Sequence, residues 1–92
     1  MVRILGDDGN ELAIATLRQT EHELLSIERV VRGKGSLLHY YFGEGRRIVH
    51  VESGNFILTG TIRTQWTGGE RLWYIKLAVP LAAPSQLVGG GG

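Results

Sequence analysis

Apolar and polar residues alternate over much of the chain, and short clusters of turn-forming residues interrupt this alternation. The clusters are centred on Asp8-Gly9, Gly33–Gly35, Gly43–Gly45, Gly54-Asn55 and Gly68-Gly69, and the segments between them are rich in Ile, Val, Leu, Thr, Tyr and Trp. A period of two is typical of strands that bury one face, and regularly spaced turns join such strands into hairpins. The pattern predicts a mainly β protein, folded as a small sandwich or barrel.

The turns in the second half of the chain set a strand register. Gly68-Gly69, Gly54-Asn55 and Glu44-Gly45 suit the two-residue turns that connect antiparallel strands. Each turn places apolar residues on the same face, although a shift of one residue would move them to the other. The registers predict a four-stranded antiparallel meander over about residues 36–79. Its pairs include Tyr40 with Val49, Leu38 with Val51, Val51 with Leu58, Leu58 with Val79, Ile62 with Ile75, and Thr64 with Trp73.

One face of this meander is the expected core, and Gly60 lies in its middle between bulky residues. A glycine inside a strand often marks a bend, which would let the meander curl towards a barrel. The predicted core face consists of Leu38, Tyr40, Phe42, Val49, Val51, Phe56, Leu58, Ile62, Trp73, Ile75, Leu77 and Val79.

The opposite face contains more apolar residues than contact with water requires. Antiparallel sheets usually keep such a face polar, whereas about half of this one is apolar. We expect either the N-terminal third or a second copy of the chain to cover it. Its residues are Leu37, His39, Tyr41, Ile48, His50, Glu52, Ile57, Thr59, Thr61, Arg63, Leu72, Tyr74 and Lys76.

The N-terminal third allows two interpretations. Residues 11–18 alternate and are expected to pair with residues 2–5 as an N-terminal hairpin. For residues 20–33, a capping box at the start and a glycine at the end favour a helix over about 20–32, packed on the sheet in an α+β fold. The strand rhythm of the whole chain favours instead a strand over residues 25–31, paired with residues 36–42. We adopt the strand.

Composition narrows the class of protein. The 92 residues predict one globular domain over residues 1–79 and a flexible tail over residues 80–92, which holds both prolines and the terminal glycines. With no cysteine, disulfides cannot support the small core, and self-association is the expected support. The net charge of +1 argues against a dedicated nucleic-acid binder. We expect a cytoplasmic protein without a signal peptide or membrane association.

Two histidines and a glutamate form the candidate metal site. His39 lies opposite His50 in the predicted meander, and Glu52 follows two residues later on the same face. Two imidazoles and a carboxylate can ligate Zn²⁺ or non-haem iron. No metal-binding motif supports the cluster, so half-exposed histidines on a mixed face are the simpler interpretation, and we predict no cofactor.

Other motifs are incomplete. The glycines at 33–36 and 43–46 lack the full pattern of a phosphate-binding loop, and hairpin turns need glycine in any case. No serine lies in a nucleophile elbow. Arginines and aromatic residues together resemble the surfaces of single-strand nucleic-acid binders, but Trp66 and Arg71 are more simply a cation–π pair at a hairpin tip. These residues are Tyr40, Tyr41, Arg46, Arg47, Arg63, Trp66, Arg71 and Trp73.

We therefore expect a non-enzymatic binding domain that acts as a homo-oligomer, with a small apolar or aromatic ligand or a protein partner. One alternative is a small enzyme with a site between subunits, built on His39, His50 and Glu52. Another is single-stranded nucleic-acid binding. The expected interface or ligand site consists of Leu37, Tyr41, Ile48, Ile57, Leu72 and Tyr74.

Overall fold

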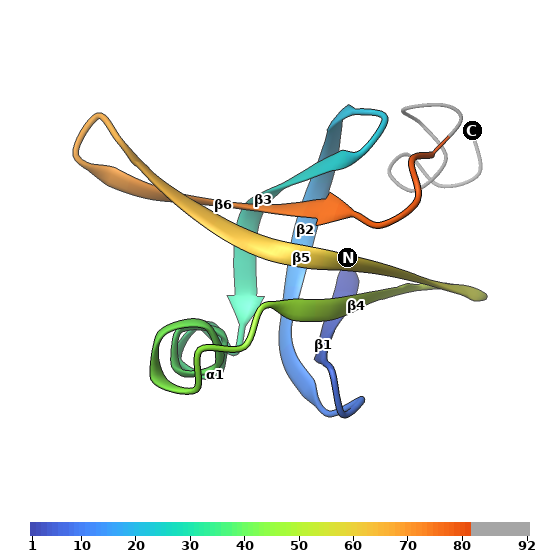
Figure 1. Ribbon diagram of the computed structural model, residues 1–92, viewed down its shortest axis with the longest axis horizontal. Helices are drawn as coiled ribbons and strands as arrows, with labels where there is room; N and C mark the ends of the chain where they lie inside the picture. Colours follow the sequence, from blue (N-terminus) through green and yellow to red (C-terminus); the bar gives the residue numbers. More distant parts are fainter. Residues whose placement is uncertain (82–92) are drawn as a thin grey trace.

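The six strands of the protein close into one antiparallel barrel (Figure 1). The computed structural model describes residues 1–81, so apart from Pro80 and Leu81 the predicted tail lies outside the described residues. The strand order is β1-β2-β3-β6-β5-β4, and β4 pairs back onto β1. This confirms the mainly β fold. The strands are β1 (Val2–Gly6), β2 (Glu11–Glu21), β3 (Leu24–Arg32), β4 (Ile48–Ser53), β5 (Phe56–Thr67) and β6 (Glu70–Leu77).

The N-terminal third consists of strands. β1 pairs with β2 as expected, and β3 follows β2 after a short turn. The helix considered over about 20–32 is wrong, because a helix would draw Glu28 into its apolar arc, whereas in β3 this residue is exposed while Leu25 is fully buried. The partner expected for β3 is also wrong: β3 pairs with β2 and β6.

Residues 34–43 are helical, which overturns the first strand of the predicted meander. Helix α1 (Lys34–Leu38) continues into a π-helical turn, η1 (His39–Gly43). Gly33 turns the chain out of β3 with a φ of +90°, and a Cβ at this position would lie 2.1 Å from the carbonyl oxygen of Leu12. The predicted pairs of Leu38 and Tyr40 with β4 therefore do not form, and β1 occupies that edge of β4.

The registers predicted for the other two hairpins are confirmed. Val49 lies opposite Gly60, and Ile62 lies opposite Ile75. Val49, Val51, Ile62, Ile75 and Leu77 are buried as expected. The pair of Leu58 with Val79 is wrong, because β6 ends at Leu77. Of the predicted core face, Phe42, Phe56 and Val79 are exposed.

Gly60 is the corner at which β5 passes from one partner to the other. β5 pairs with β4 over Phe56–Thr61 and with β6 over Gly60–Thr67. A Cβ at Gly60 would lie 2.6 Å from the carbonyl oxygen of Lys76 and 2.7 Å from Cγ2 of Ile75. The strands approach each other too closely there for a side chain, as expected of a glycine at a barrel corner.

Tyr40 ties the helical segment to the barrel. Its side chain is buried, and its hydroxyl donates a hydrogen bond to the carbonyl oxygen of Ile48 (2.6 Å) and accepts one from the backbone N–H of Asp7 (2.8 Å). Burial raises the pKa of this hydroxyl above its ordinary value, because the interior disfavours the phenolate. Leu37, from α1, is buried in the same core. No helix in residues 1–81 is long and apolar enough to span a membrane.

The close approach at Gly60 predicts opposite effects of one substitution at two glycines. Gly60→Ala should lower the free energy of unfolding by about 1–3 kcal/mol, because the added methyl group overpacks the corner. Gly35→Ala should raise it by about 0.5–1 kcal/mol, because a Cβ in α1 meets no atom within 4 Å and alanine favours helix. Urea unfolding measures both values. Equal stability of Gly60→Ala and wild type would contradict the role of Gly60.

Tyr40 predicts a loss of stability in alkaline solution. Tyr40→Phe should cost about 1–3 kcal/mol near neutral pH, because the carbonyl of Ile48 and the N–H of Asp7 lose their partner. Since the folded state holds the pKa of Tyr40 above its unfolded value, the wild type should lose stability as the pH rises above about 10. Urea unfolding between about pH 8 and 11 should show a shallower decline for Tyr40→Phe. Parallel curves would contradict the prediction.

Candidate functional site

The face expected to be covered is the outer surface of the barrel, and no element in residues 1–81 lies over its β4–β5 part. The N-terminal strands complete the barrel instead. Ile48 and Ile57 are 52% and 56% exposed, and Leu72 on β6 is 46% exposed. Of the other predicted interface residues, Tyr41 and Tyr74 are half-buried, and Leu37 belongs to the core. The six residues thus do not form one surface.

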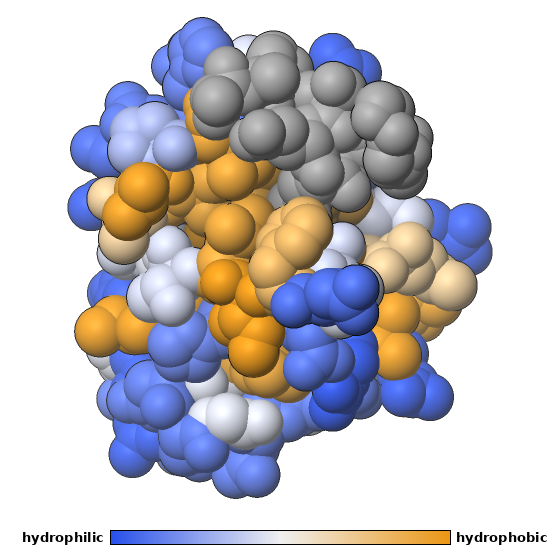
Figure 2. All heavy atoms as spheres, turned by 90° about the vertical axis from the view of Figure 1, so that its right-hand side faces the viewer, coloured by the Kyte–Doolittle hydropathy of each residue, from blue (hydrophilic) through white to orange (hydrophobic). Residues whose placement is uncertain are grey.

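A second apolar area lies on the side that carries the N-terminus and the β4–β5 turn, away from α1 (Figure 2). Among the apolar residues outside α1 and η1, Met1 at the N-terminus, Phe56 at the start of β5 and Val79 beyond β6 are exposed. The chain beyond β6 is held beside the β2–β3 turn, because the backbone N–H of Leu81 donates to the carbonyl oxygen of His22 at 2.7 Å.

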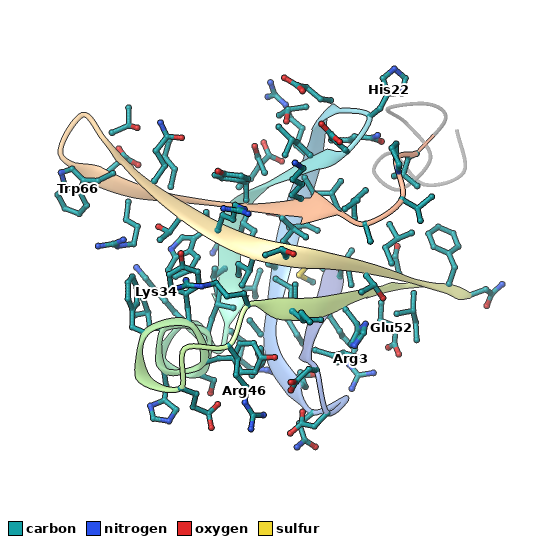
Figure 3. The ribbon with its side chains drawn as sticks, viewed as in Figure 1. Arg3, His22, Lys34, Arg46, Glu52 and Trp66 are labelled. Atoms are coloured by element: carbon teal, nitrogen blue, oxygen red, sulfur yellow. The ribbon has the colours of Figure 1, made fainter. Side chains whose placement is uncertain are left out.

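The candidate metal site does not assemble. Its register required a strand over residues 36–42, whereas His39 lies in η1. His50 instead lies between Leu5 and Thr59, and its Nδ1 is 2.9 Å from the hydroxyl of Thr59. Glu52 points towards Arg3 (Figure 3) and forms an ion pair with it. Residues 1–81 contain no group of three side chains able to hold a metal ion.

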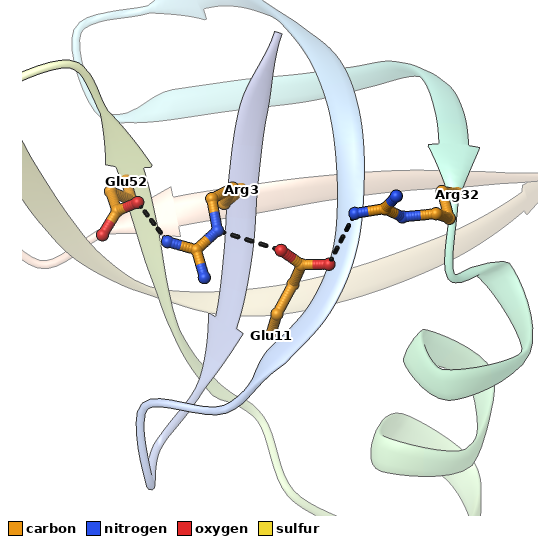
Figure 4. A network of polar contacts seen from close by, with 4 residues as sticks. All are labelled: Arg3, Glu11, Arg32 and Glu52. Carbon is orange, nitrogen blue, oxygen red and sulfur yellow. Dashed lines mark hydrogen bonds and ion pairs between the residues drawn. The ribbon is translucent and has the colours of Figure 1, made fainter.

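Arg3 belongs to a network of ion pairs between side chains of β1, β2, β3 and β4 (Figure 4). Glu11 accepts from Nε of Arg3 at 2.9 Å and from Nη2 of Arg32 at 3.2 Å. Hydrogen bonds from Arg3, and then from Arg32, lower the pKa of Glu11 below its ordinary value. Arg3 and Arg32 therefore both have carboxylate partners in this network.

The opposite side carries aromatic rings and arginines in mutual contact. We call it the arginine–aromatic cluster. Tyr41, Phe42 and Trp73 pack edge to face, with ring centroids 4.7 to 6.1 Å apart. Cζ of Arg47 lies 3.9 Å from the ring centroid of Tyr41, which is a cation–π distance. The cluster consists of Tyr41, Phe42, Arg47, Trp66, Arg71 and Trp73.

Arg71 links the two parts of this cluster. Its Cζ lies 4.8 Å from the ring centroid of Phe42 and 5.4 Å from that of Trp66, which confirms the predicted Trp66–Arg71 contact. Nη1 of Arg71 donates to the hydroxyl of Thr64 at 3.3 Å, and this hydroxyl donates to the carbonyl oxygen of Leu72. Trp66 lies near the tip of the β5–β6 hairpin, which projects from the barrel (Figure 3).

Two grooves flank β6 beside this cluster. β3 and β6 pair only from Leu24 to Ile27, and then β3 turns towards α1 while β6 follows β5 into the projecting hairpin (Figure 1). The groove in this gap has a volume of about 570 Å³. The other, of about 620 Å³, lies over the paired part of β3, β5 and β6. Both are bounded by Leu72 and Trp73, so they meet at these residues.

The charged residues of the two grooves are mostly basic. The grooves are lined by five cationic side chains and three carboxylates. The cations are Arg29, Lys34, Arg63, Arg71 and Lys76, and the carboxylates are Glu23, Glu28 and Glu70. Within residues 1–81, none of these five cations forms an ion pair, in contrast to Arg3, Arg32 and Arg46.

Sequence reasoning found only part of this site. The arginines and aromatic residues that the sequence groups together include every member of the cluster except Phe42, and the turn at Gly68-Gly69 places Trp66 opposite Arg71. Tyr41 and Phe42 were assigned to a strand, so their contact with Trp73 could not be foreseen. No family model, curated protein or solved structure matches this chain.

Proposed function

We propose that the protein is a non-enzymatic binding domain whose ligand lies across β6, over the arginine–aromatic cluster and the two grooves beside it. The observation that carries this proposal is that both grooves meet at Leu72 and Trp73, next to three packed aromatic rings. Concave surfaces lined by aromatic rings and a few convergent polar groups are typical of ligand sites.

The groups at this site favour a ligand with flat, unsaturated parts. Phe42 and Trp66 are 54% and 65% exposed, although aromatic rings gain much by burial. The guanidinium group of Arg71 is already oriented by Thr64, so it loses little freedom when a ligand binds. Flat ligands can stack on such rings and on such a guanidinium group.

The same lining supports binding rather than catalysis. His22, His39 and His50 do not line either groove, and the chain has no cysteine. The usual pairing of a nucleophile with an imidazole base is thus not offered by these surfaces. What they offer is stacking, apolar contact and hydrogen bonding.

Small aromatic fragments test this proposal. Heteroaromatic fragments titrated into ¹⁵N-labelled protein should shift the amide signals of Leu72, Trp73 and Tyr74 more than those of β1 and β2. Leu72→Ala should weaken this binding by about tenfold, because it removes apolar contact worth about 1.4 kcal/mol. Phe56→Ala, an equally exposed control at the start of β5, should bind as the wild type does. Shifts that are absent at β6, or unchanged by Leu72→Ala, would refute the proposed site.

We also propose that the protein self-associates through the outer face of β4 and β5. Ile48 and Ile57 are each more than half exposed there, and a chain of this size has a small core that commonly gains from association. A stable interface buries roughly 800 Å² on each partner, which needs the breadth of both strands.

Native mass in solution checks this second proposal. The wild type should elute as a dimer or higher oligomer by light scattering on a sizing column. Ile48→Glu and Ile57→Glu should each give a smaller species, because the added carboxylate would be buried in the interface without a partner. Val31→Glu, an exposed apolar position on β3, is the matched control and should keep the wild-type mass. A monomeric wild type would exclude the proposed interface.

A further inference from the structure

The charges of this small protein are divided between two sides, which the net charge of +1 conceals. Arg3 of β1 is held between Glu11 of β2 and Glu52 of β4, and Arg46, just before β4, donates to Asp7 in the β1–β2 turn at 3.1 Å. Around β6, Arg47 and Arg71 lie on aromatic rings instead of carboxylates. Apart from Arg18 on β2, the cations of residues 1–81 that form no ion pair line the two grooves or lie on the aromatic rings.

The contacts of these arginines leave their hydrogen-bonding capacity open. A guanidinium group stacked on a ring uses its face, whereas its N–H donors lie in its plane. Arg71 uses one donor on Thr64, and Arg47 makes no side-chain hydrogen bond within residues 1–81. Such donors suit phosphate oxygens, which arginine binds in a bidentate geometry.

We infer that the ligand of the arginine–aromatic cluster is a single-stranded nucleic acid. Bases stack on the exposed rings of Trp66 and Phe42, and the phosphates beside them contact Arg47 and Arg71, while a phosphate on the other face of β6 contacts Arg63. Single-strand binders combine these two elements, a positively charged groove and aromatic side chains. This inference rests on the proposed binding site and adds the chemical class of its ligand.

Unpaired bases fit this surface better than a duplex does. Stacking on Trp66 requires a free base face, and in a duplex these faces are covered by the neighbouring base pairs. The excess of cations in the two grooves favours a chain with regular negative charges. A polyanion without bases can contact the arginines but leaves the aromatic rings without stacking partners. Comparing the binding of such a polyanion with that of a single strand therefore distinguishes the two kinds of ligand.

The small number of available cations sets the salt dependence. With about three phosphates neutralised, the slope of log K against log salt for a single strand should be about −2. Affinity should therefore fall about 20-fold between about 50 and 200 mM salt. A strongly basic groove would give a much steeper decline.

Fluorescence anisotropy with a labelled oligothymidylate of about 12 nucleotides tests the inference, since single-strand sites start at about 4 nucleotides. Trp66→Ala should weaken binding at least about fivefold, and Trp66→Phe should restore most of it, because the phenyl ring still stacks. The control variant Phe56→Ala removes an exposed aromatic ring at the other end of β5 and should bind as the wild type does. Arg47→Gln should weaken binding, whereas Arg46→Gln, the neighbouring residue paired with Asp7, should have little effect.

The outcomes separate the inference from the proposed site. Binding with a shallow salt slope and a loss specific to Trp66→Ala and Arg47→Gln supports the inference. Equal binding of heparin, or of a labelled acidic peptide, with no effect of Trp66→Ala would overturn it, because charge alone would then explain the interaction. If oligothymidylate fails to bind while aromatic fragments still shift β6, the inference is wrong and the proposed site stands. If both fail, both are wrong.

Discussion

The bend of β5 at Gly60 is the constraint on which the architecture depends. The first half of β5 pairs with β4 and the second half with β6, and only around Gly60 does the strand pair with both. Because β5 turns at this corner, β4 is free to reach β1 and close the barrel. The same turn directs the second half of β5, with β6, away from β3, and this divergence creates the groove beside Trp73.

Local turn chemistry explains why much of the fold could be predicted. A two-residue turn fixes the register of both its strands, so Gly68-Gly69 and Gly54-Asn55 determined which residues of β4, β5 and β6 lie opposite each other. Burial then follows from the period of two, as the buried Val49 and Ile62 show. The closure of β4 onto β1 pairs residues that are distant in sequence, and no local signal specifies it.

The helical segment shows where this reasoning reaches its limit. Residues 37–42 are almost all apolar or aromatic, so they show neither a period of two nor one of 3.6, and short runs of this kind are ambiguous. The deciding contact is at Gly33, whose backbone passes too close to Leu12 for a side chain. His39, Tyr41 and Phe42 all lie in this segment. The predicted metal site depends on His39 being in a strand, so it does not form, and a strand does not predict the contact of Tyr41 and Phe42 with Trp73.

The two sides of the barrel differ in a way that stability alone does not explain. The network of Arg3, Glu11 and Glu52 pairs a cation with two carboxylates on the surface of β1, β2 and β4. The surface around Trp66 differs, because it carries exposed aromatic rings and a cation that forms no ion pair within residues 1–81. Ordinary polar residues at these positions would serve the fold equally well. Sequences depart from local rules mainly where function requires it. The exposed rings and the unmatched cations coincide around β6, and for this reason we propose that the ligand binds on that side.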